Sequence, residues 1–179
     1  MRIISGQHKG RRIMAPKKLP VRPTSDMAKE ALFNILNNLI DFDGISVLDL
    51  FSGTGNISYE FASRGAALVT AVDIDSGCTA FTTKTALALE MPIRAIKSDV
   101  FKYLEKTNVQ VDIIFVDPPY NIGFESFAKV PKMVFENELL KKDGYLIIEH
   151  SDKTDLSNEP YCKNFRKYGG SVFSFFQWD

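Results

Sequence analysis

Residues 46–65, SVLDLFSGTGNISYEFASRG, contain a short apolar run, a turn with two glycines and an amphipathic helical pattern in direct succession. Further apolar runs follow along the chain, and helical patterns separate them. Apolar runs without polar alternation are typical of parallel strands buried on both faces by the helices that connect them. We therefore predict an α/β fold with a doubly wound, mostly parallel sheet of seven strands.

The elements of this sheet follow from the spacing of apolar residues and from turn signals. The predicted strands are residues 46–50, 68–72, 93–96, 112–116 and 145–148, followed by a hairpin of 164–168 and 171–178 around Gly169-Gly170. The predicted helices lie near residues 56–64, 76–90, 100–106 and 125–141, with Gly65 and Gly144 as stop signals.

Residues 1–40 are predicted to form an extension packed on the main domain, residues 41–179. Two short β-prone stretches, 2–5 and 11–14, flank Gly6 and Gly10 and favour a small basic β-hairpin. Pro16, Pro20 and Pro23 then keep the chain extended, and Thr24, Ser25 or Asp26 caps a helix that runs to about Leu39.

Length and composition exclude several classes of protein. The chain has 179 residues, of which 45% are hydrophobic and 25% charged, so it can bury the core of one domain and is not a disordered chain or a coiled coil. Its two cysteines, Cys78 and Cys162, form neither a disulfide framework nor a zinc motif. Because no apolar run reaches 18 residues and the N-terminus lacks an apolar signal segment, we expect a cytoplasmic protein without a membrane span.

The formal net charge is zero, but the charges are unevenly distributed. Residues 1–30 carry eight basic and two acidic side chains, which gives +6 there and −6 in the remainder. A basic cluster on one short segment is typical of nucleic-acid binders, although a solvated terminal arm is the alternative. The candidate RNA-binding residues are Arg2, Lys9, Arg11, Arg12, Lys17, Lys18 and Arg22.

Ligands of doubly wound sheets bind beyond the carboxyl ends of the strands, so the residues that follow each strand are candidates. Gly53 and Gly55 allow a sharp turn, but Ser58 stands where a dinucleotide fingerprint has its third glycine. Asp73 suits the hydroxyls of a ribose, whereas Asp75 or Ser76 can cap a helix. The candidate cofactor-binding residues are Asp49, Phe51, Gly53, Gly55, Asp73, Asp99 and Val100.

The most specific motif follows the fourth strand, where Asp117-Pro118-Pro119-Tyr120 delivers a carboxylate, a rigid backbone and an aromatic ring to the ligand edge. The prolines have a fixed φ and no N–H, so the carbonyls of this turn are free to accept hydrogen bonds. A carboxylate and a carbonyl that accept both hydrogens of an exocyclic amine favour a pyramidal nitrogen with a localised lone pair. A rigid turn without a catalytic role is the alternative.

The order of Asp49, Gly53, Asp73, Asp99 and the Asp117–Tyr120 tetrad resembles class I (Rossmann-like) S-adenosylmethionine-dependent methyltransferases that modify exocyclic amines. The segments MRIISG (1–6), KGR (9–11), RPT (22–24), EALFNIL (30–36) and SRGA (63–66) are similar to the RsmD family of bacterial 16S rRNA guanine-N2 methyltransferases.

This resemblance implies methyl transfer from S-adenosylmethionine to the N2 amine of a guanine in small-subunit rRNA, at position 966. It also implies a partly or fully assembled small subunit as substrate, and we expect a monomer without a metal. Asp117, Pro118, Pro119 and Tyr120 are the catalytic candidates, with Tyr120 stacking on the base.

Three other functions remain open at this point. The same tetrad occurs in adenine-N6 and other DNA amino-methyltransferases, but only about 40 residues lie outside the α/β core, too few for a separate target-reading domain. A non-catalytic RNA-binding or ribosome-assembly module is a second alternative, and a nicotinamide oxidoreductase is a third. The role of Glu149-His150-Ser151 is unassigned, and we expect His150 to be a loop residue that faces solvent.

Overall fold

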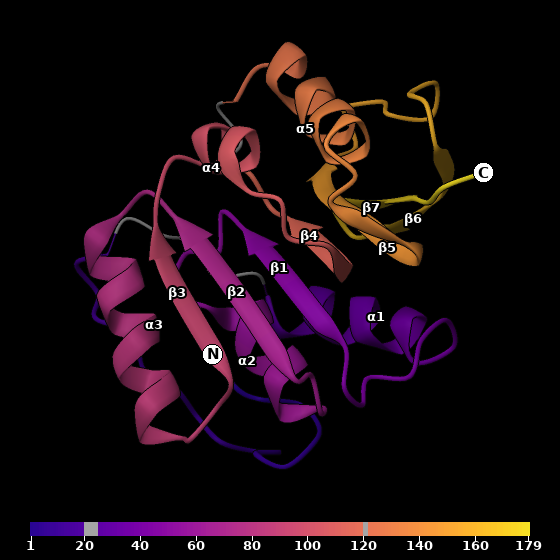
Figure 1. The fold of residues 1–179 in the computed structure, drawn as a ribbon. Coiled ribbons are helices and arrows are strands. Elements are labelled where there is room, and N and C mark those ends of the chain that lie inside the picture. Colours follow the sequence, from indigo (N-terminus) through magenta and orange to yellow (C-terminus); the bar gives the residue numbers. More distant parts are fainter. Residues whose placement is uncertain (20–24, 120–121) are drawn as a thin grey trace.

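The computed structural model describes residues 1–19, 25–119 and 122–179, and its centre is a seven-stranded sheet (Figure 1). The strand order is β3-β2-β1-β4-β5-β7-β6. β7 pairs antiparallel with both β5 and β6, and the other four pairings are parallel. This confirms the predicted doubly wound, mostly parallel sheet. The strands are β1 (Ser46–Leu50), β2 (Leu68–Asp73), β3 (Ile93–Lys97), β4 (Val111–Val116), β5 (Leu140–Ser151), β6 (Cys162–Tyr168) and β7 (Ser171–Phe176).

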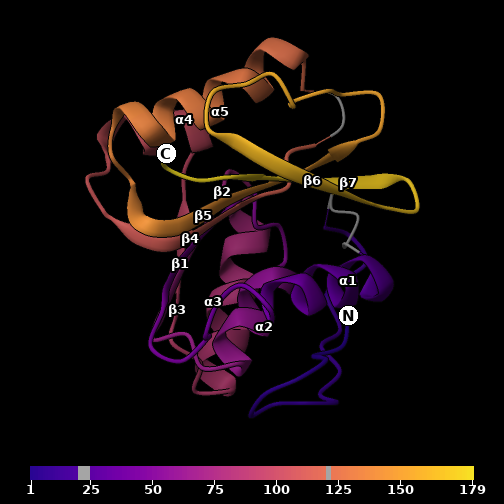
Figure 2. The ribbon, with the colours of Figure 1, turned by 90° about the vertical axis from the view of Figure 1, so that its right-hand side faces the viewer.

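The helices cover both faces of the sheet, as Figure 2 shows with the sheet seen edge-on. One face carries α1 (Asp26–Leu36), α2 (Asn56–Ser63) and α3 (Ser76–Ala88), and the other carries α4 (Val100–Lys106) and α5 (Phe124–Glu136). Ser25 caps α1 by accepting the N–H of Ala28, as the sequence predicted among its three candidates. None of the helices in the described ranges has an apolar stretch long enough to cross a membrane.

The helix predicted near 125–141 is present as α5, but its predicted end, with Gly144 as the stop signal, was wrong. The helix ends at Glu136 because Glu138 adopts a left-handed conformation, φ 53°, and Leu139 N–H returns to the Val134 carbonyl at 2.9 Å. A glycine-free Schellman motif of this kind leaves no compositional signal. Gly144 instead lies inside β5, where an added Cβ would meet the Asp112 carbonyl at 2.5 Å.

The fifth strand is longer than predicted, because it continues through Glu149-His150-Ser151 and pairs with β7 along its whole carboxyl half. His150 is therefore not a solvent-facing loop residue but a strand residue that is 4% exposed. Its Nε2 lies 2.8 Å from the Ser174 hydroxyl, and burial lowers the pKa of the imidazole. The sequence did not predict this burial, because it depends on β7 pairing from 20 or more residues away.

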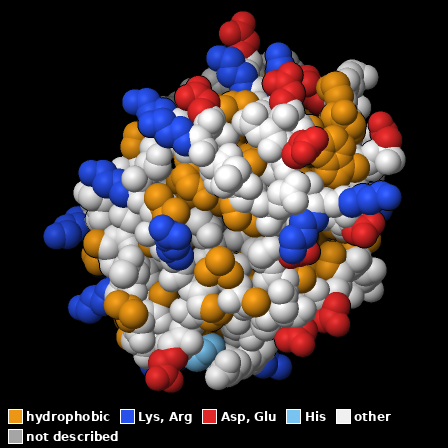
Figure 3. All heavy atoms as spheres, in the orientation of Figure 1, with side chains coloured by type: hydrophobic (Ala, Val, Ile, Leu, Met, Phe, Trp, Pro, Cys, Tyr) orange, Lys and Arg blue, Asp and Glu red, His pale blue; other side chains and the backbone are white. Residues whose placement is uncertain are grey.

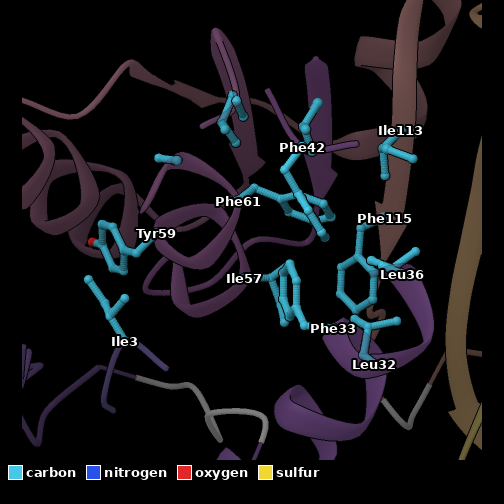
Figure 4. Packing of buried hydrophobic residues seen from close by; sticks show 14 of the residues in the cluster. Ile3, Leu32, Phe33, Leu36, Phe42, Ile57, Tyr59, Phe61, Ile113 and Phe115 are labelled. Atoms are coloured by element: carbon cyan, nitrogen blue, oxygen red, sulfur yellow. The ribbon is translucent and has the colours of Figure 1, made fainter. Parts of the chain in front are cut away.

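Each face of the sheet has its own hydrophobic cluster. On the α1 face, Leu32, Phe33 and Leu36 are fully buried and point toward Phe115 of β4 (Figure 4). The same cluster includes Ile3 and Ile13, so the N-terminal segment shares the core of the main domain. The opposite cluster packs α4 and α5 against Leu48, Ile114 and Val116.

The N-terminal segment forms a minimal hairpin with one β-bridge, between Arg2 and Arg12. Ile3 N–H donates to the Arg11 carbonyl at 2.9 Å, and Gly10 N–H donates to the Ile3 carbonyl at 2.8 Å. The loop packs so tightly on the last turn of α2 that a Cβ on Gly6 would lie 1.8 Å from the Ser63 carbonyl oxygen. The predicted hairpin is thus present, with too few ladder bonds for full strands.

Candidate active site

The predicted site residues follow three neighbouring strands at one edge of the sheet. Leu50 of β1 lies opposite Val72 of β2 and Val116 of β4, so the next residues, Phe51, Asp73 and Asp117, stand side by side at the carboxyl ends of the three strands. Ser52 N–H donates to the Val72 carbonyl at 3.1 Å, which keeps the loops after β1 and β2 side by side. The strand order reverses between β1 and β4, where doubly wound sheets bind their ligands.

The turn after β1 is held in left-handed conformations. Phe51, Gly53 and Gly55 have φ values of 58°, 51° and 82°. For a phenylalanine this is a strained conformation, of the kind that clusters at binding sites. An added Cβ on Gly55 would lie 3.0 Å from the Tyr59 ring, so this glycine is required by the turn and by packing on its own helix.

Asp73 connects the first two loops. Its Oδ2 accepts the N–H of Gly53 at 2.8 Å and its Oδ1 accepts the N–H of Asp75 at 2.8 Å. Each carboxylate oxygen has a second lone pair, so both can still accept a ribose hydroxyl. Asp75 caps α3 by accepting the N–H of Cys78, as the sequence predicted for Asp75 or Ser76. The residues present therefore fit an adenosine.

Asp49 lies beneath the glycine turn and is 2% exposed. It accepts a hydrogen bond from the Ser58 hydroxyl of α2. Burial raises the pKa of Asp49 to about 7, against the opposing effect of the Ser58 hydrogen bond. Asp49 thus supports the turn from below rather than facing the ligand. From the sequence, Ser58 was noted only as the residue in place of a third glycine. Its role as the hydrogen-bond donor to Asp49 was not predicted.

Asp99 and Val100 lie next to Asp73, because Ser98 N–H donates to the Asp73 carbonyl at 2.9 Å. Asp99 caps α4 by accepting the N–H of Lys102 at 3.0 Å, and the N–H of Val100, in the first turn, has no partner within the helix. Phe51 packs edge-to-face on Phe101, with ring centroids 6.3 Å apart. Aromatic surface, a carboxylate and a backbone N–H are therefore available together for a purine ring.

The turn after β4 presents Asp117 half-buried, Pro118 buried and Pro119 exposed. Asp117 N–H donates to the Leu50 carbonyl at 3.4 Å, which ties this turn to the end of β1. The carbonyl of Pro119 accepts the N–H of Ile122 at 3.0 Å. Ile113, Ile114, Phe115 and Val116 are at most 1% exposed, so the strand behind the turn is buried, as predicted. Tyr120 lies outside the described residues.

The basic residues of the N-terminal segment are exposed, namely Arg2, Lys9, Arg11, Arg12, Lys17 and Lys18; Arg22 lies outside the described residues. Lys9 lies beside the C-terminal end of α2, whereas residues near Leu19 reach the first turn of α3, where a Cβ on Gly77 would meet the Leu19 side chain at 2.8 Å. Lys17 and Lys18 thus precede a residue that contacts the first turn of α3, next to Asp75. Figure 3 shows further Lys and Arg side chains on the α3 side of the molecule.

One basic residue of this segment is not on the surface. Lys29 is 1% exposed, and its ammonium donates to the Arg2 carbonyl at 2.6 Å and to Asn56 Oδ1 at 2.8 Å. It lies 3.6 Å from the carboxylate of Glu60, which also accepts the N–H groups of Ile4 and Ser5. The positive charge that the sequence assigned to residues 1–30 is therefore partly neutralised inside the protein.

Comparisons with known proteins identify the family to which this geometry belongs. The family model described as "Conserved hypothetical protein 95" matches residues 1–177. The ribosomal RNA small subunit methyltransferase D of Buchnera aphidicola subsp. Baizongia pistaciae is 30% identical over 153 residues, which cover 85% of this chain and 76% of that protein. The chain belongs to the RsmD family. This membership confirms the predicted family and enzyme class.

Solved structures confirm the fold. The Escherichia coli protein yhhF superposes with a TM-score of 0.87 at 24% identity, over 100% of this chain and 99% of that chain. The Thermus thermophilus 16S rRNA N2 G1207 methyltransferase RsmC, solved with AdoMet and guanosine, superposes with a TM-score of 0.69 at 22% identity. That match covers 89% of this chain and 45% of RsmC. The RsmD-family chain therefore has the class I methyltransferase fold.

Proposed function

We propose that this chain transfers a methyl group from S-adenosylmethionine to the exocyclic N2 amine of a guanine in 16S ribosomal RNA. Its RsmD-family relatives carry the name ribosomal RNA small subunit methyltransferase D, which agrees with the predicted cofactor and substrate class. The observation that carries the proposal is the meeting of Asp73, the glycine turn and Asp117-Pro118-Pro119 on three adjacent strand ends.

The cofactor would bind over β1 and β2. Asp73 would accept the ribose hydroxyls, Phe51 would contact the adenine, and Asp99 and Val100 would contact its polar edge. When bound, S-adenosylmethionine supplies an electrophilic methyl group on a positively charged sulfur. The strained turn at Phe51 and Gly53 is held by Asp73 before any ligand arrives, so little ordering free energy is lost on binding.

The turn after β4 would hold the amine. The Asp117 carboxylate accepts one hydrogen and the Pro118 carbonyl accepts the other, so the nitrogen lone pair is directed at the methyl carbon. The nitrogen–carbon bond forms as the sulfur–carbon bond breaks. The methylated nitrogen is then cationic and acidic, and Asp117 or water takes its proton. No covalent nucleophile or metal ion is needed, because orientation and fixed acceptors do the catalytic work.

The finer substrate features are part of the same proposal. The exposed basic residues of the N-terminal segment would bind RNA phosphates, and Tyr120 would stack on the extruded base. The target would be the guanine at position 966, in a partly or fully assembled small subunit, and the chain would act in the cytoplasm as a monomer.

Mass spectrometry of rRNA tests this function directly. Small subunits from a strain that lacks the endogenous activity are incubated with S-adenosylmethionine, with and without the protein, and the modified nucleotide is mapped. One new N2-methylguanine in 16S rRNA is the expected result. Methylation of naked DNA at adenine would favour the DNA-methyltransferase alternative, and a chain that fails to bind S-adenosylmethionine in calorimetry would favour a non-catalytic module.

A further inference from the structure

Glu149 of β5 has a buried carboxylate oxygen without a partner. Its Oε1 accepts a hydrogen bond from the Ser171 hydroxyl at 2.8 Å, whereas its Oε2 is buried and has no hydrogen-bond partner within the described ranges. The residue is 6% exposed, and burial raises the pKa of its carboxyl group. A buried carboxyl oxygen without a hydrogen bond lowers the stability of the folded protein. A ligand that donates a hydrogen bond to Oε2 would remove this cost.

The register of the sheet places Glu149 beside the catalytic turn. Val116 of β4 lies opposite Ile148 of β5, so the residues that follow, Asp117 and Glu149, stand at the same level on neighbouring strands. Neighbouring strands are about 4.8 Å apart. Phe115 and Ile147, two residues earlier, both lie in the cluster on the α1 face. Because side chains alternate along a strand, Glu149 points to that same face.

The carboxyl edge of the sheet thus carries its polar groups in a fixed order: Asp73 as the last residue of β2, the glycine turn after β1, Asp117 after β4 and Glu149 near the end of β5. The proposed function assigns the first two to the cofactor and the third to the reacting amine. The body of the base must then lie on the side away from the cofactor, which is the β5 side.

We propose that Glu149 is a specificity residue that accepts the N1–H of the target guanine. This inference rests on the proposed function and names the group that selects the base. In guanine, the N1–H donor is adjacent to the N2 amine, so two carboxylates on neighbouring strands can accept from both at once. Adenine has no hydrogen at N1, so it cannot donate a hydrogen bond to Oε2.

Ser171 completes the arrangement. By donating to Oε1, its hydroxyl fixes the carboxylate and leaves Oε2 as the atom that meets the base. Both residues belong to the pairing of β5 with β7, in which Ser151 lies opposite Ser171. The group therefore sits on rigid strands rather than on a loop, which suits a residue that must discriminate between bases.

The test changes the target base on one side of the proposed hydrogen bond and residue 149 on the other. The substrate is a small subunit assembled on 16S rRNA that carries either guanine or 2-aminopurine at the mapped target. 2-Aminopurine keeps the N2 amine but lacks both the N1–H and the O6 carbonyl, so the comparison of the protein variants assigns the preference to Glu149. The proteins are the wild type, Glu149→Gln, and Glu136→Gln as a control on the exposed face of α5. The readouts are kcat/KM for each base and the calorimetric Kd for S-adenosylmethionine.

The wild type and Glu136→Gln should prefer guanine by at least about tenfold, the range of a good base contact. In Glu149→Gln the Ser171 hydroxyl should hold the amide oxygen, which leaves the NH2 group, a donor, facing the base. This variant should therefore lower kcat/KM for guanine by a similar factor and bring the two bases within about threefold, with the Kd for S-adenosylmethionine unchanged. Ser171→Ala, which removes only the hydroxyl on Oε1, should reduce the preference partially and serves if Glu149→Gln fails to fold.

Two results would overturn the inference: a wild type that does not distinguish the bases, or substituted proteins that keep the wild-type preference. Failure of the proposed function looks different, because the wild type would then bind S-adenosylmethionine and methylate neither substrate.

Discussion

The Oδ2 atom of Asp73 accepts the N–H of Gly53 at 2.8 Å, so the carboxylate after β2 holds the glycine turn after β1. The residue that is proposed to bind the ribose therefore also sets the shape of the turn beside it. Asp73→Ala should weaken binding of S-adenosylmethionine by about 10- to 100-fold, because hydrogen bonds to a charged group are lost. Calorimetric titration measures this change.

Asp75→Ala is the matched control for Asp73→Ala. It removes the cap on the N–H of Cys78 and leaves the glycine turn intact, so it should lower the melting temperature slightly and leave the Kd nearly unchanged. Equal losses of affinity in both variants would contradict the proposed division of roles.

Asp117→Ala should lower the rate of methyl transfer by about 10²–10³, by analogy with the loss of one preorganised electrostatic partner. Asp117→Asn should be less damaging, because its amide oxygen can still accept a hydrogen from the amine. Single-turnover rates with saturating cofactor separate this effect from binding. Near-normal turnover of the alanine variant, with cofactor binding intact, would rule out the catalytic assignment of Asp117.

Asp49 should make the protein less stable as the pH rises. Its pKa is about 7 in the folded chain against an ordinary value of 3.8, so the folded state holds a proton that the unfolded state has released. Its contribution to stability is therefore full at low pH, falls as the pH rises toward 7, and is constant above that value. Asp49→Asn keeps an acceptor for Ser58 and removes the titration.

The measurement is the melting temperature of both proteins between pH 5 and pH 8. The wild type should lose stability relative to Asp49→Asn across this range. The other titratable groups are the same in both proteins, so their effect cancels in this comparison. Ser58→Ala removes a hydrogen bond that lowers the pKa of Asp49, so it should shift the transition to higher pH. Parallel curves for wild type and Asp49→Asn would show that Asp49 does not titrate there.

The sequence predicted those features that depend on local signals. The strand before Asp117, the left-handed glycines at positions 53 and 55, and the cap at Asp75 all follow from residues within a few positions of each other. The order of the motifs then fixed the family resemblance.

The features that were not predicted depend on distant partners. The burial of His150 and the length of β5 depend on pairing with β7. The position of Glu149 beside Asp117 depends on the register between β5 and β4. Lys29 was counted in the +6 charge of residues 1–30, and its burial was not predicted because its partner, Glu60, lies 31 residues further along the chain. Composition and periodicity carry no information on such pairs.

Glu60→Ala should destabilise the protein by about 3–5 kcal/mol, because it leaves the ammonium of Lys29 buried without its counter-charge. It also removes the acceptor of the Ile4 and Ser5 N–H groups, so amide exchange of the first residues should accelerate. Urea unfolding gives the change in free energy. As a control, Glu136→Gln breaks an exposed pair with Lys132 and should lower the free energy of unfolding by less than about 0.5 kcal/mol. Equal losses in the two variants would contradict the conclusion that Glu60 stabilises the N-terminal segment.

RNA affinity should depend steeply on salt if the N-terminal segment binds phosphates. About four contacts to single-stranded phosphates predict a slope near −3 for log affinity against log salt. The double substitution Lys17→Ala and Lys18→Ala should make the slope less negative by more than 1, because it removes two phosphate contacts, each worth about 0.7 of slope on a single strand. Lys142 lies near the amino end of β5, away from the carboxyl edge of the sheet, so Lys142→Ala should leave the slope unchanged. Filter binding between 50 and about 300 mM salt measures the slopes, and a salt-independent affinity would remove the RNA-binding role from this segment.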